Sequence, residues 1–106
     1  MASEQRFVRV ASVDEVPPGE MKAVEVDGAQ VVLVNSGGEV YALHDSCTHE
    51  YFPLSEGTLE GDCVVCLLHG ARFKLETGAA SAPAFEPVRT YEVRIDGEDV
   101  LVAAQE

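Results

Sequence analysis

The chain has 106 residues, which gives room for one domain with one hydrophobic core. Hydrophobic residues make up 46% and charged residues 25% of the sequence, an ordinary globular composition that indicates neither disorder nor a fibrous repeat. The formal net charge of −12, from 19 acidic against 7 basic side chains, argues against a nucleic-acid partner, because phosphate binding depends on Lys and Arg.

Short alternating or β-branched segments, separated by Gly and Pro, predict an all-β fold. Asp27 and Gly28 form a tight-turn signal between two such segments, and Asp96 and Gly97 repeat it near the end. The one candidate helical turn, at 12–20, is cut off by two prolines. In chain order the expected strands are 6–12, 22–26, 29–35, 40–44, 90–96 and 99–104.

The middle of the chain, from about residue 45 to 87, differs from its flanks. It holds four glycines and three prolines, with strand candidates only at 63–65 and 72–75. We therefore expect a single domain, 1–106, in which 45–87 is an inserted loop-rich subdomain. Loops of this length need something to fix them, and a metal centre between two of them would do so.

The three cysteines, Cys47, Cys63 and Cys66, are too few and odd in number for a disulfide framework, which fits a reducing compartment. No apolar run approaches the about 20 residues that cross a bilayer, and the start MASEQRFVRV lacks the pattern of a signal peptide. We therefore expect a cytoplasmic monomer without membrane partners, whose cysteines serve thiol chemistry or metal binding.

Two Cys/His pairs stand in the middle segment: Cys47-x-His49 and, sixteen residues later, Cys66-x-x-His69. A single zinc ion is one interpretation, although zinc knuckles usually place two cysteines two to four residues apart. A zinc set that uses Cys63 and Cys66 with Cys47 would leave one His without a role. A two-iron cluster, in which each pair contributes its Cys to one iron and its His to the other, uses all four side chains.

The pattern Cys47-x-His49 with Cys66-x-x-His69-Gly70 resembles the signature of Rieske [2Fe-2S] proteins, and bacterial Rieske ferredoxins in particular. The resemblance extends over LSEGTLEGD (54–62), HGARFKLETG (69–78) and PAFEPVRTYEVRIDGEDVLV (83–102). It implies one [2Fe-2S] cluster, with Cys47 and Cys66 on one iron and His49 and His69 on the other. It also implies a Rieske fold, an antiparallel sandwich-like basal domain with an inserted cluster-binding subdomain that a loop around Pro83 covers.

The resemblance further implies a low redox potential. High-potential members of the family have a disulfide at the positions that Phe52 and Leu68 hold here. They also have Ser and Tyr, whose hydroxyls donate to cluster sulfur, where this chain has Ala71 and Phe73. Fewer hydrogen bonds to sulfur disfavour the added electron, so we expect a potential near the low end of the Rieske range, about −150 mV.

The implied function is one-electron transfer from an NAD(P)H-dependent flavin reductase to a terminal oxygenase. We expect no stand-alone enzyme, because only His44 remains to bind a second iron centre. Two alternatives stay open: an accessory ferredoxin of iron-sulfur assembly, and a small subunit of a nitrite or arsenite oxidoreductase.

Three further predictions concern residues outside the ligand set. Cys63 is expected to be a small buried hydrophobe at a strand start, and His44 a polar strand end. An apolar set near the ligands is expected to pack the loops and to offer a docking surface: Tyr51, Phe52, Pro53, Leu68, Pro83 and Phe85.

Overall fold

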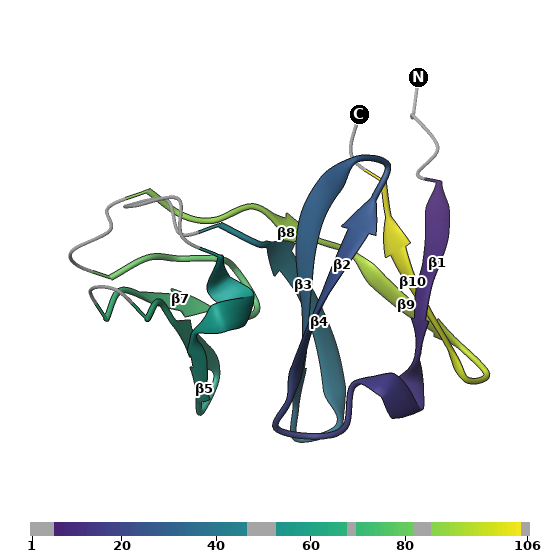
Figure 1. Ribbon diagram of the computed structural model, residues 1–106, viewed down its shortest axis with the longest axis horizontal. Helices are drawn as coiled ribbons and strands as arrows, with labels where there is room; N and C mark the ends of the chain where they lie inside the picture. Colours follow the sequence, from purple (N-terminus) through teal and green to yellow (C-terminus); the bar gives the residue numbers. More distant parts are fainter. Residues whose placement is uncertain (1–5, 47–52, 68–69, 82–85, 105–106) are drawn as a thin grey trace.

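A computed structural model describes residues 6–46, 53–67, 70–81 and 86–104. In these residues the strands form three antiparallel sheets, accompanied only by two 3-10 turns, so the all-β prediction is confirmed (Figure 1). The strands are β1 (Phe7–Ser12), β2 (Met21–Val26), β3 (Ala29–Ser36), β4 (Glu39–His44), β5 (Thr58–Glu60), β6 (Cys63–Val65), β7 (Arg72–Lys74), β8 (Thr90–Tyr91), β9 (Val93–Asp96) and β10 (Asp99–Ala103). The helical turns are η1 (Val13–Glu15) and η2 (Leu54–Glu56), each far too short to reach across a bilayer.

The central sheet has the order β2-β3-β4-β8 and is covered on both faces. On β3, Val31 and Leu33 join one hydrophobic core, while Val32 and Val34 join another. This arrangement explains the unbroken β-branched run of β3, because a strand covered on both faces has no solvent side for polar residues. The first, basal core contains Ala11, Val16, Val26, Val31, Leu33, Ala42, Tyr91, Val100, Val102 and Ala104. The second, loop-side core contains Val32, Val34, Leu43, Leu54, Val64, Cys66, Ala71, Phe73, Leu75 and Val88.

The two outer sheets lie on opposite sides of the central one (Figure 1). The sheet β1-β10-β9 pairs the start of the described chain with its end, with Phe7 opposite Ala103. The small sheet β5-β6-β7 lies between β4 and β8 in the sequence, within the segment that the glycines and prolines mark. Of its strands, β6 and β7 agree with the prediction, whereas β5 was not predicted.

The hairpin turns show how far local sequence sets local geometry. Asp27 and Gly28 form a two-residue loop between Val26 and Ala29, with φ of 51° and 86°, as the turn signal predicted. At the last hairpin Asp96 pairs with Asp99, so the loop is Gly97 with Glu98, one position later than expected. Only the glycine of that loop has a positive φ, 65°, which glycine adopts without steric cost.

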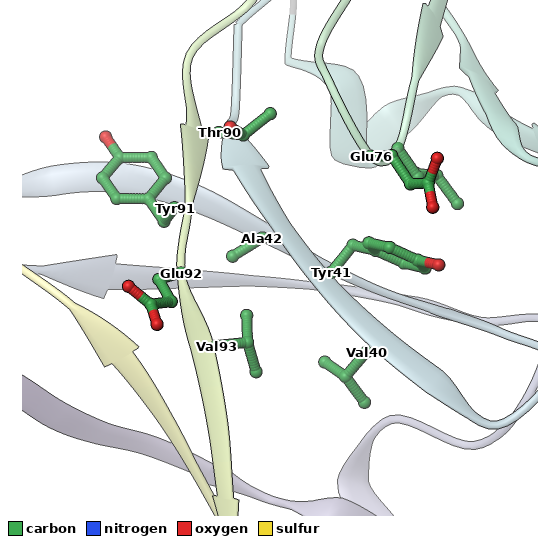
Figure 2. Close-up of a pocket in the computed structure, with 9 residues that line it drawn as sticks. Val40, Tyr41, Ala42, Glu76, Thr90, Tyr91, Glu92 and Val93 are labelled. Atoms are coloured by element: carbon green, nitrogen blue, oxygen red, sulfur yellow. The ribbon is translucent and has the colours of Figure 1, made fainter.

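The predicted strand 90–96 is divided between two sheets. β8 pairs with β4, whereas β9 pairs with β10, and the chain changes sheet at Glu92, whose carbonyl accepts a hydrogen bond from the Ala103 amide (2.9 Å). An open groove of about 330 Å³ lies beside this crossing, and Figure 2 shows Val40 and Val93 on its two sides. Cys66, the one described residue of the Cys/His pattern, is not among the residues that line it.

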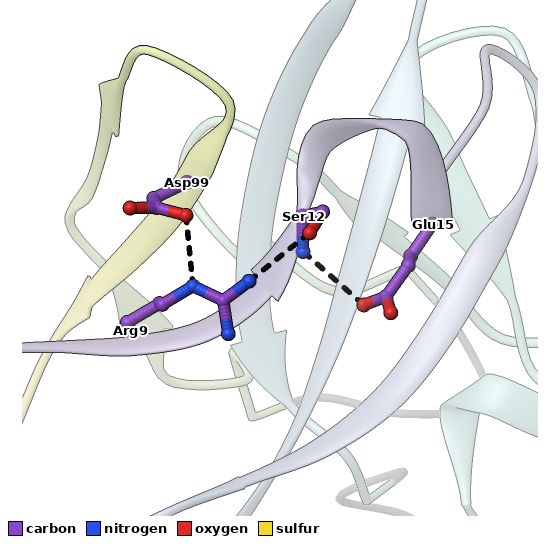
Figure 3. Close-up of polar contacts among 4 residues, drawn as sticks. All are labelled: Arg9, Ser12, Glu15 and Asp99. Atoms are coloured by element: carbon purple, nitrogen blue, oxygen red, sulfur yellow. Dashed lines mark hydrogen bonds and ion pairs between the residues drawn. The ribbon is translucent and has the colours of Figure 1, made fainter.

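Hydrogen bonds among polar side chains connect β1 and η1 to the last hairpin (Figure 3). Arg9 Nε donates to Asp99 Oδ1 (2.8 Å), and its Nη2 donates to Ser12 Oγ (3.0 Å). The Ser12 amide donates to Glu15 Oε1 (3.1 Å), which caps η1 where the sequence has its candidate helical turn. Because the Arg9 and Asp99 side chains are about half exposed, this ion pair contributes little to the free energy of unfolding.

The contribution of the buried Asn35 side chain to the stability of the fold can be tested. Its buried side chain donates from Nδ2 to the Val16 carbonyl (2.7 Å) and accepts at Oδ1 from the Gly38 amide (2.9 Å). Asn35→Ala leaves both backbone groups without this partner, so we expect the free energy of unfolding to fall by about 1–3 kcal/mol in urea denaturation. Gln30→Ala, at an exposed position of the same strand, is the control and should stay within about 0.5 kcal/mol of the parent. Equal losses in the two variants would contradict this account of Asn35.

Candidate metal centre

The described ends of three loops meet in the loop-side core. Leu54 follows the first loop (46–53), Cys66 and Ala71 bound the second (66–71), and Val88 follows the third (79–87). All four residues are at most 3% exposed and belong to one hydrophobic cluster. Segments that are far apart in the sequence are therefore held at one end of the molecule, where Figure 1 places β5 and β7.

The second loop connects β6 to β7 and begins at Cys66, which is 1% exposed. The Cys66 amide donates to the Ala71 carbonyl (2.8 Å), and the Gly70 amide donates back to the Cys66 carbonyl (3.0 Å). Gly70 has a φ of 75°, a conformation that a side chain would strain. A hairpin closed by its own backbone thus holds Cys66, while its predicted partner His69 lies outside the described residues.

The first loop joins β4 to η2, and its predicted ligands Cys47 and His49 lie outside the described residues. At its start, the buried carboxylate of Asp45 accepts hydrogen bonds from the Ser55 amide (2.7 Å) and from Ser55 Oγ (2.8 Å). Just beyond, Gly57 lies against β6, where an added Cβ would come within 2.0 Å of the Val65 carbonyl oxygen. Only glycine permits this approach.

The third loop is attached to the second. The Ser81 amide donates to the Arg72 carbonyl (2.9 Å), and the Arg72 amide donates to Ser81 Oγ (3.1 Å). The Val88 amide donates to the Gly78 carbonyl (2.9 Å) at the other end of the loop. Pro83, the predicted cover of the cluster, lies between these anchors but outside the described residues.

Cys63 differs from Cys66 in position and environment. It begins β6 and is half-buried, and its Sγ lies 3.5 Å from Asp62 Oδ1 as a hydrogen-bond donor. Burial, and then the bond to Asp62, raises the pKa of the Cys63 thiol, so this thiol is protonated at neutral pH. Val64 and Cys66 share the loop-side core, so Cys63 points to the opposite face of the strand, unsuited to bind one zinc ion together with Cys66.

The chemistry of the described residues fits an iron-sulfur cluster. Cys66 is a buried thiol at the start of a closed loop, and the pattern adds one more cysteine and two histidines, the donor set of two thiolates and two imidazoles. Ala71 and Phe73, both fully buried in the same core, offer no hydroxyl there. His44, the last residue of β4, is half-buried and pairs with Val31, as expected of a polar strand end.

One exposed residue of the site was missed in the sequence. Leu67 follows Cys66 in the second loop and is 59% exposed, one of the two large hydrophobic side chains exposed among the described residues. Pro53 is the one described member of the predicted apolar set, and it too is exposed. The available signal was the position of Leu67 directly after the candidate ligand Cys66 in a short loop, because the neighbour of a buried residue in such a loop tends to point outward.

Comparison with known proteins agrees with this geometry. The sequence model of the Rieske [2Fe-2S] domain family matches residues 6–92 of this chain. The chain is 48% identical, over 91% of its length and 90% of the relative's, to the biphenyl dioxygenase ferredoxin subunit of Pseudomonas sp. (strain KKS102).

Solved structures give the same result. The ferredoxin of carbazole 1,9a-dioxygenase from Nocardioides aromaticivorans IC177 has a TM-score of 0.89 and 39% identity, covering 93% of this chain and 98% of that one. A complex of reduced oxygenase and oxidized ferredoxin in carbazole 1,9a-dioxygenase also matches, with a TM-score of 0.89, 34% identity and 97% of each chain covered. Structures described as proposed nitrite reductase small subunits are only 21% and 24% identical and share the fold alone. The chain therefore belongs to the Rieske [2Fe-2S] domain family, as an electron-transfer ferredoxin with one cluster of that type and not as an enzyme in itself.

Proposed function

We propose that this ferredoxin carries single electrons from an NAD(P)H-dependent flavin reductase to the terminal oxygenase of a ring-hydroxylating system. The observation that carries the proposal is the 48% identity, over nine-tenths of both chains, to a ferredoxin subunit of a dioxygenase. A related ferredoxin has been captured in complex with its oxygenase, which supports the same direction of transfer here. When bound, the cluster supplies a site that accepts and releases one electron.

Within this proposal Cys47 and Cys66 bind one iron, and His49 and His69 bind the other. The buried position of Cys66 supports it, because a thiolate ligand shielded from water keeps the cluster from hydrolysis. The backbone-closed second loop supports it too, since such a loop holds its ligand in place before the metal arrives. We also propose that residues 1–106 form one domain, with 45–87 as the cluster-binding subdomain.

A low potential is part of the proposal. Ala71 and Phe73 stand beside Cys66 in the loop-side core, where a hydroxyl could otherwise donate to sulfur. Neither side chain has one, so the reduced state lacks two stabilising bonds. The net charge of −12 acts in the same direction. A potential near the low end of the Rieske range suits a carrier that is reduced through a flavin.

The partners are proposed to dock at the end of the molecule that carries the loops. Leu67 and Pro53 are exposed there, which offers an apolar contact at the ligand loops. The acidic surface favours a reductase with a basic face, so the association rate should fall as salt rises. We further propose a monomer that binds no nucleic acid, given the charge, and a cytoplasmic location, given the three cysteines.

No observation on the described residues favours the alternatives of iron-sulfur assembly or of a nitrite or arsenite oxidoreductase subunit. The half-buried, protonated Cys63 gives no support to an assembly role, for which its extra thiol was the sequence feature in question.

The first test is the spectrum of the purified protein. We expect two irons and two acid-labile sulfides per chain, visible absorption, and an EPR signal on one-electron reduction. With the reductase and oxygenase of a biphenyl dioxygenase system as probes, the protein should support product formation that stops when it is omitted. A colourless zinc protein without sulfide would overturn the ligand proposal, whereas a coloured protein that accepts no electrons from any flavin reductase would overturn the partners.

The second test concerns the potential. Ala71→Ser restores a hydroxyl beside Cys66 and should raise the midpoint potential in protein-film voltammetry. One hydrogen bond is worth about 1 kcal/mol, and 1.4 kcal/mol corresponds to about 59 mV for one electron, so the expected rise is about 40–60 mV. Ala79→Ser, at an exposed position of the third loop, is the control and should leave the potential unchanged. A parent potential well above zero would sink the low-potential assignment.

The third test separates the two described cysteines. Cys63→Ser should retain the visible spectrum, while Cys66→Ser should lose or strongly change it, because only the buried thiol is proposed as a ligand. In the protein with its cluster, one thiol should react with iodoacetamide, with a pH-rate midpoint above the usual value for cysteine, since the pKa of Cys63 is raised. Loss of the spectrum in Cys63→Ser would return the zinc or alternative ligand sets to consideration.

A further inference from the structure

The two ligand loops are closed by different means. The second loop is the connection of a hairpin, with the ladder of β6 and β7 beneath it and backbone hydrogen bonds across its base. The first loop leaves the end of β4 and returns in η2, and these two elements are not paired strands. Its closure must therefore come from other contacts.

Asp45 supplies such a contact. Its carboxylate bridges ten residues, with Oδ1 accepting from the Ser55 amide (2.7 Å) and Oδ2 from Ser55 Oγ (2.8 Å). Asp45 is itself tied to the central sheet, because its amide donates to the Gln30 carbonyl (2.9 Å). On the other side of the loop, Leu54 is fully buried next to Ser55. Both ends of the first loop are thus fastened to the scaffold through one side chain.

The carboxylate of Asp45 is buried, so it depends on hydrogen bonds within the protein. Asp45 is 9% exposed and is the one buried carboxylate in the described part of the chain. A buried charge is costly unless it is hydrogen-bonded, and bonds to a carboxylate are about twice as strong as neutral ones. The two hydrogen bonds from Ser55 offset the cost of burying the Asp45 carboxylate, and they join the two ends of the loop.

We propose that Asp45 is a positioning residue that holds together the two described ends of the first ligand loop. The inference rests on the proposed ligand set, because the loop that it closes carries Cys47 and His49. The second pair has the β6/β7 ladder beneath it, whereas the described ends of the first loop are joined by the contact between Asp45 and Ser55. Loss of that contact should therefore shorten the time for which the cluster is retained.

The alternative is that Asp45 contributes only to general stability, as Asn35 does. The two side chains form a matched pair, because each is buried and each makes two hydrogen bonds. Asn35 joins residues 19 and 3 positions away, and Asp45 joins a residue ten positions away. Asn35 lies between Val16 and Gly38, away from the ligand loops, so Asn35→Ala is the control for a loss of stability without a loss of loop closure.

The variants are Asp45→Ala, which removes both bonds, Asp45→Asn, which keeps the volume, and Ser55→Ala, which keeps the bond from the Ser55 amide. In the protein with its cluster, the rate of bleaching by an excess of iron chelator should rise at least about tenfold in Asp45→Ala, and less in the other two. Hydrogen exchange by mass spectrometry should accelerate in the peptide covering residues 46–55 and stay unchanged in the peptide covering 66–71. Asn35→Ala should change neither readout below its unfolding transition.

The proposal is overturned if Asp45→Ala and Ser55→Ala bleach at the parent rate, or if Asn35→Ala accelerates both readouts equally. Should Asp45→Ala fail to fold, Ser55→Ala and Asp45→Asn carry the test. The exchange measurement needs no cluster, so a failure of the proposed ligand set, seen in the parent spectrum, stays distinguishable from a failure of the closure by Asp45.

Discussion

The burial of the central sheet on both faces is the constraint on which the rest of the molecule depends. Residues 31–35 of β3 are all buried, with alternate side chains in the basal and the loop-side core. One strand therefore contributes side chains to both cores. Because β3 has no solvent face, a shift of its register by one residue would exchange the contents of the two cores, which fixes the pairing strongly.

Because the central sheet is covered on both faces, the end of the molecule that carries β5, β6 and β7 can consist largely of loops. Among the described residues, the small β5-β6-β7 sheet is the one sheet beyond the loop-side core. The loops there are held by different contacts: a hairpin ladder, a buried carboxylate, and a serine that both donates to and accepts from Arg72. Glycine at positions 57 and 78 permits backbone contacts that any side chain would block. The described ends of the three loops are thus held in place by contacts of the protein itself.

The sequence was sufficient for the parts of the structure that local chemistry determines. The β-branched run of β3, the turn at Asp27 and Gly28, and the strand candidates beside Cys66 follow from side-chain shape and backbone freedom, and they were predicted. The division of 90–96 was not, because Glu92 becomes a crossing point only through the pairing of its neighbours with β4 and β10. The hydrogen bonds between Asp45 and Ser55 were equally invisible in the sequence, since they join residues ten positions apart.

The pairing of β1 with β10 has a consequence for how such a domain is used in larger proteins. Phe7 and Ala103 are opposite each other, in the sheet that lies across the central sheet from the loops (Figure 1). A fold whose first and last strands are neighbours enters and leaves at one place, so it can be inserted into another polypeptide through two adjacent linkers. The architecture is therefore compatible with a separate carrier and with a module of a longer chain, whose linkers would join it on the side away from the loops.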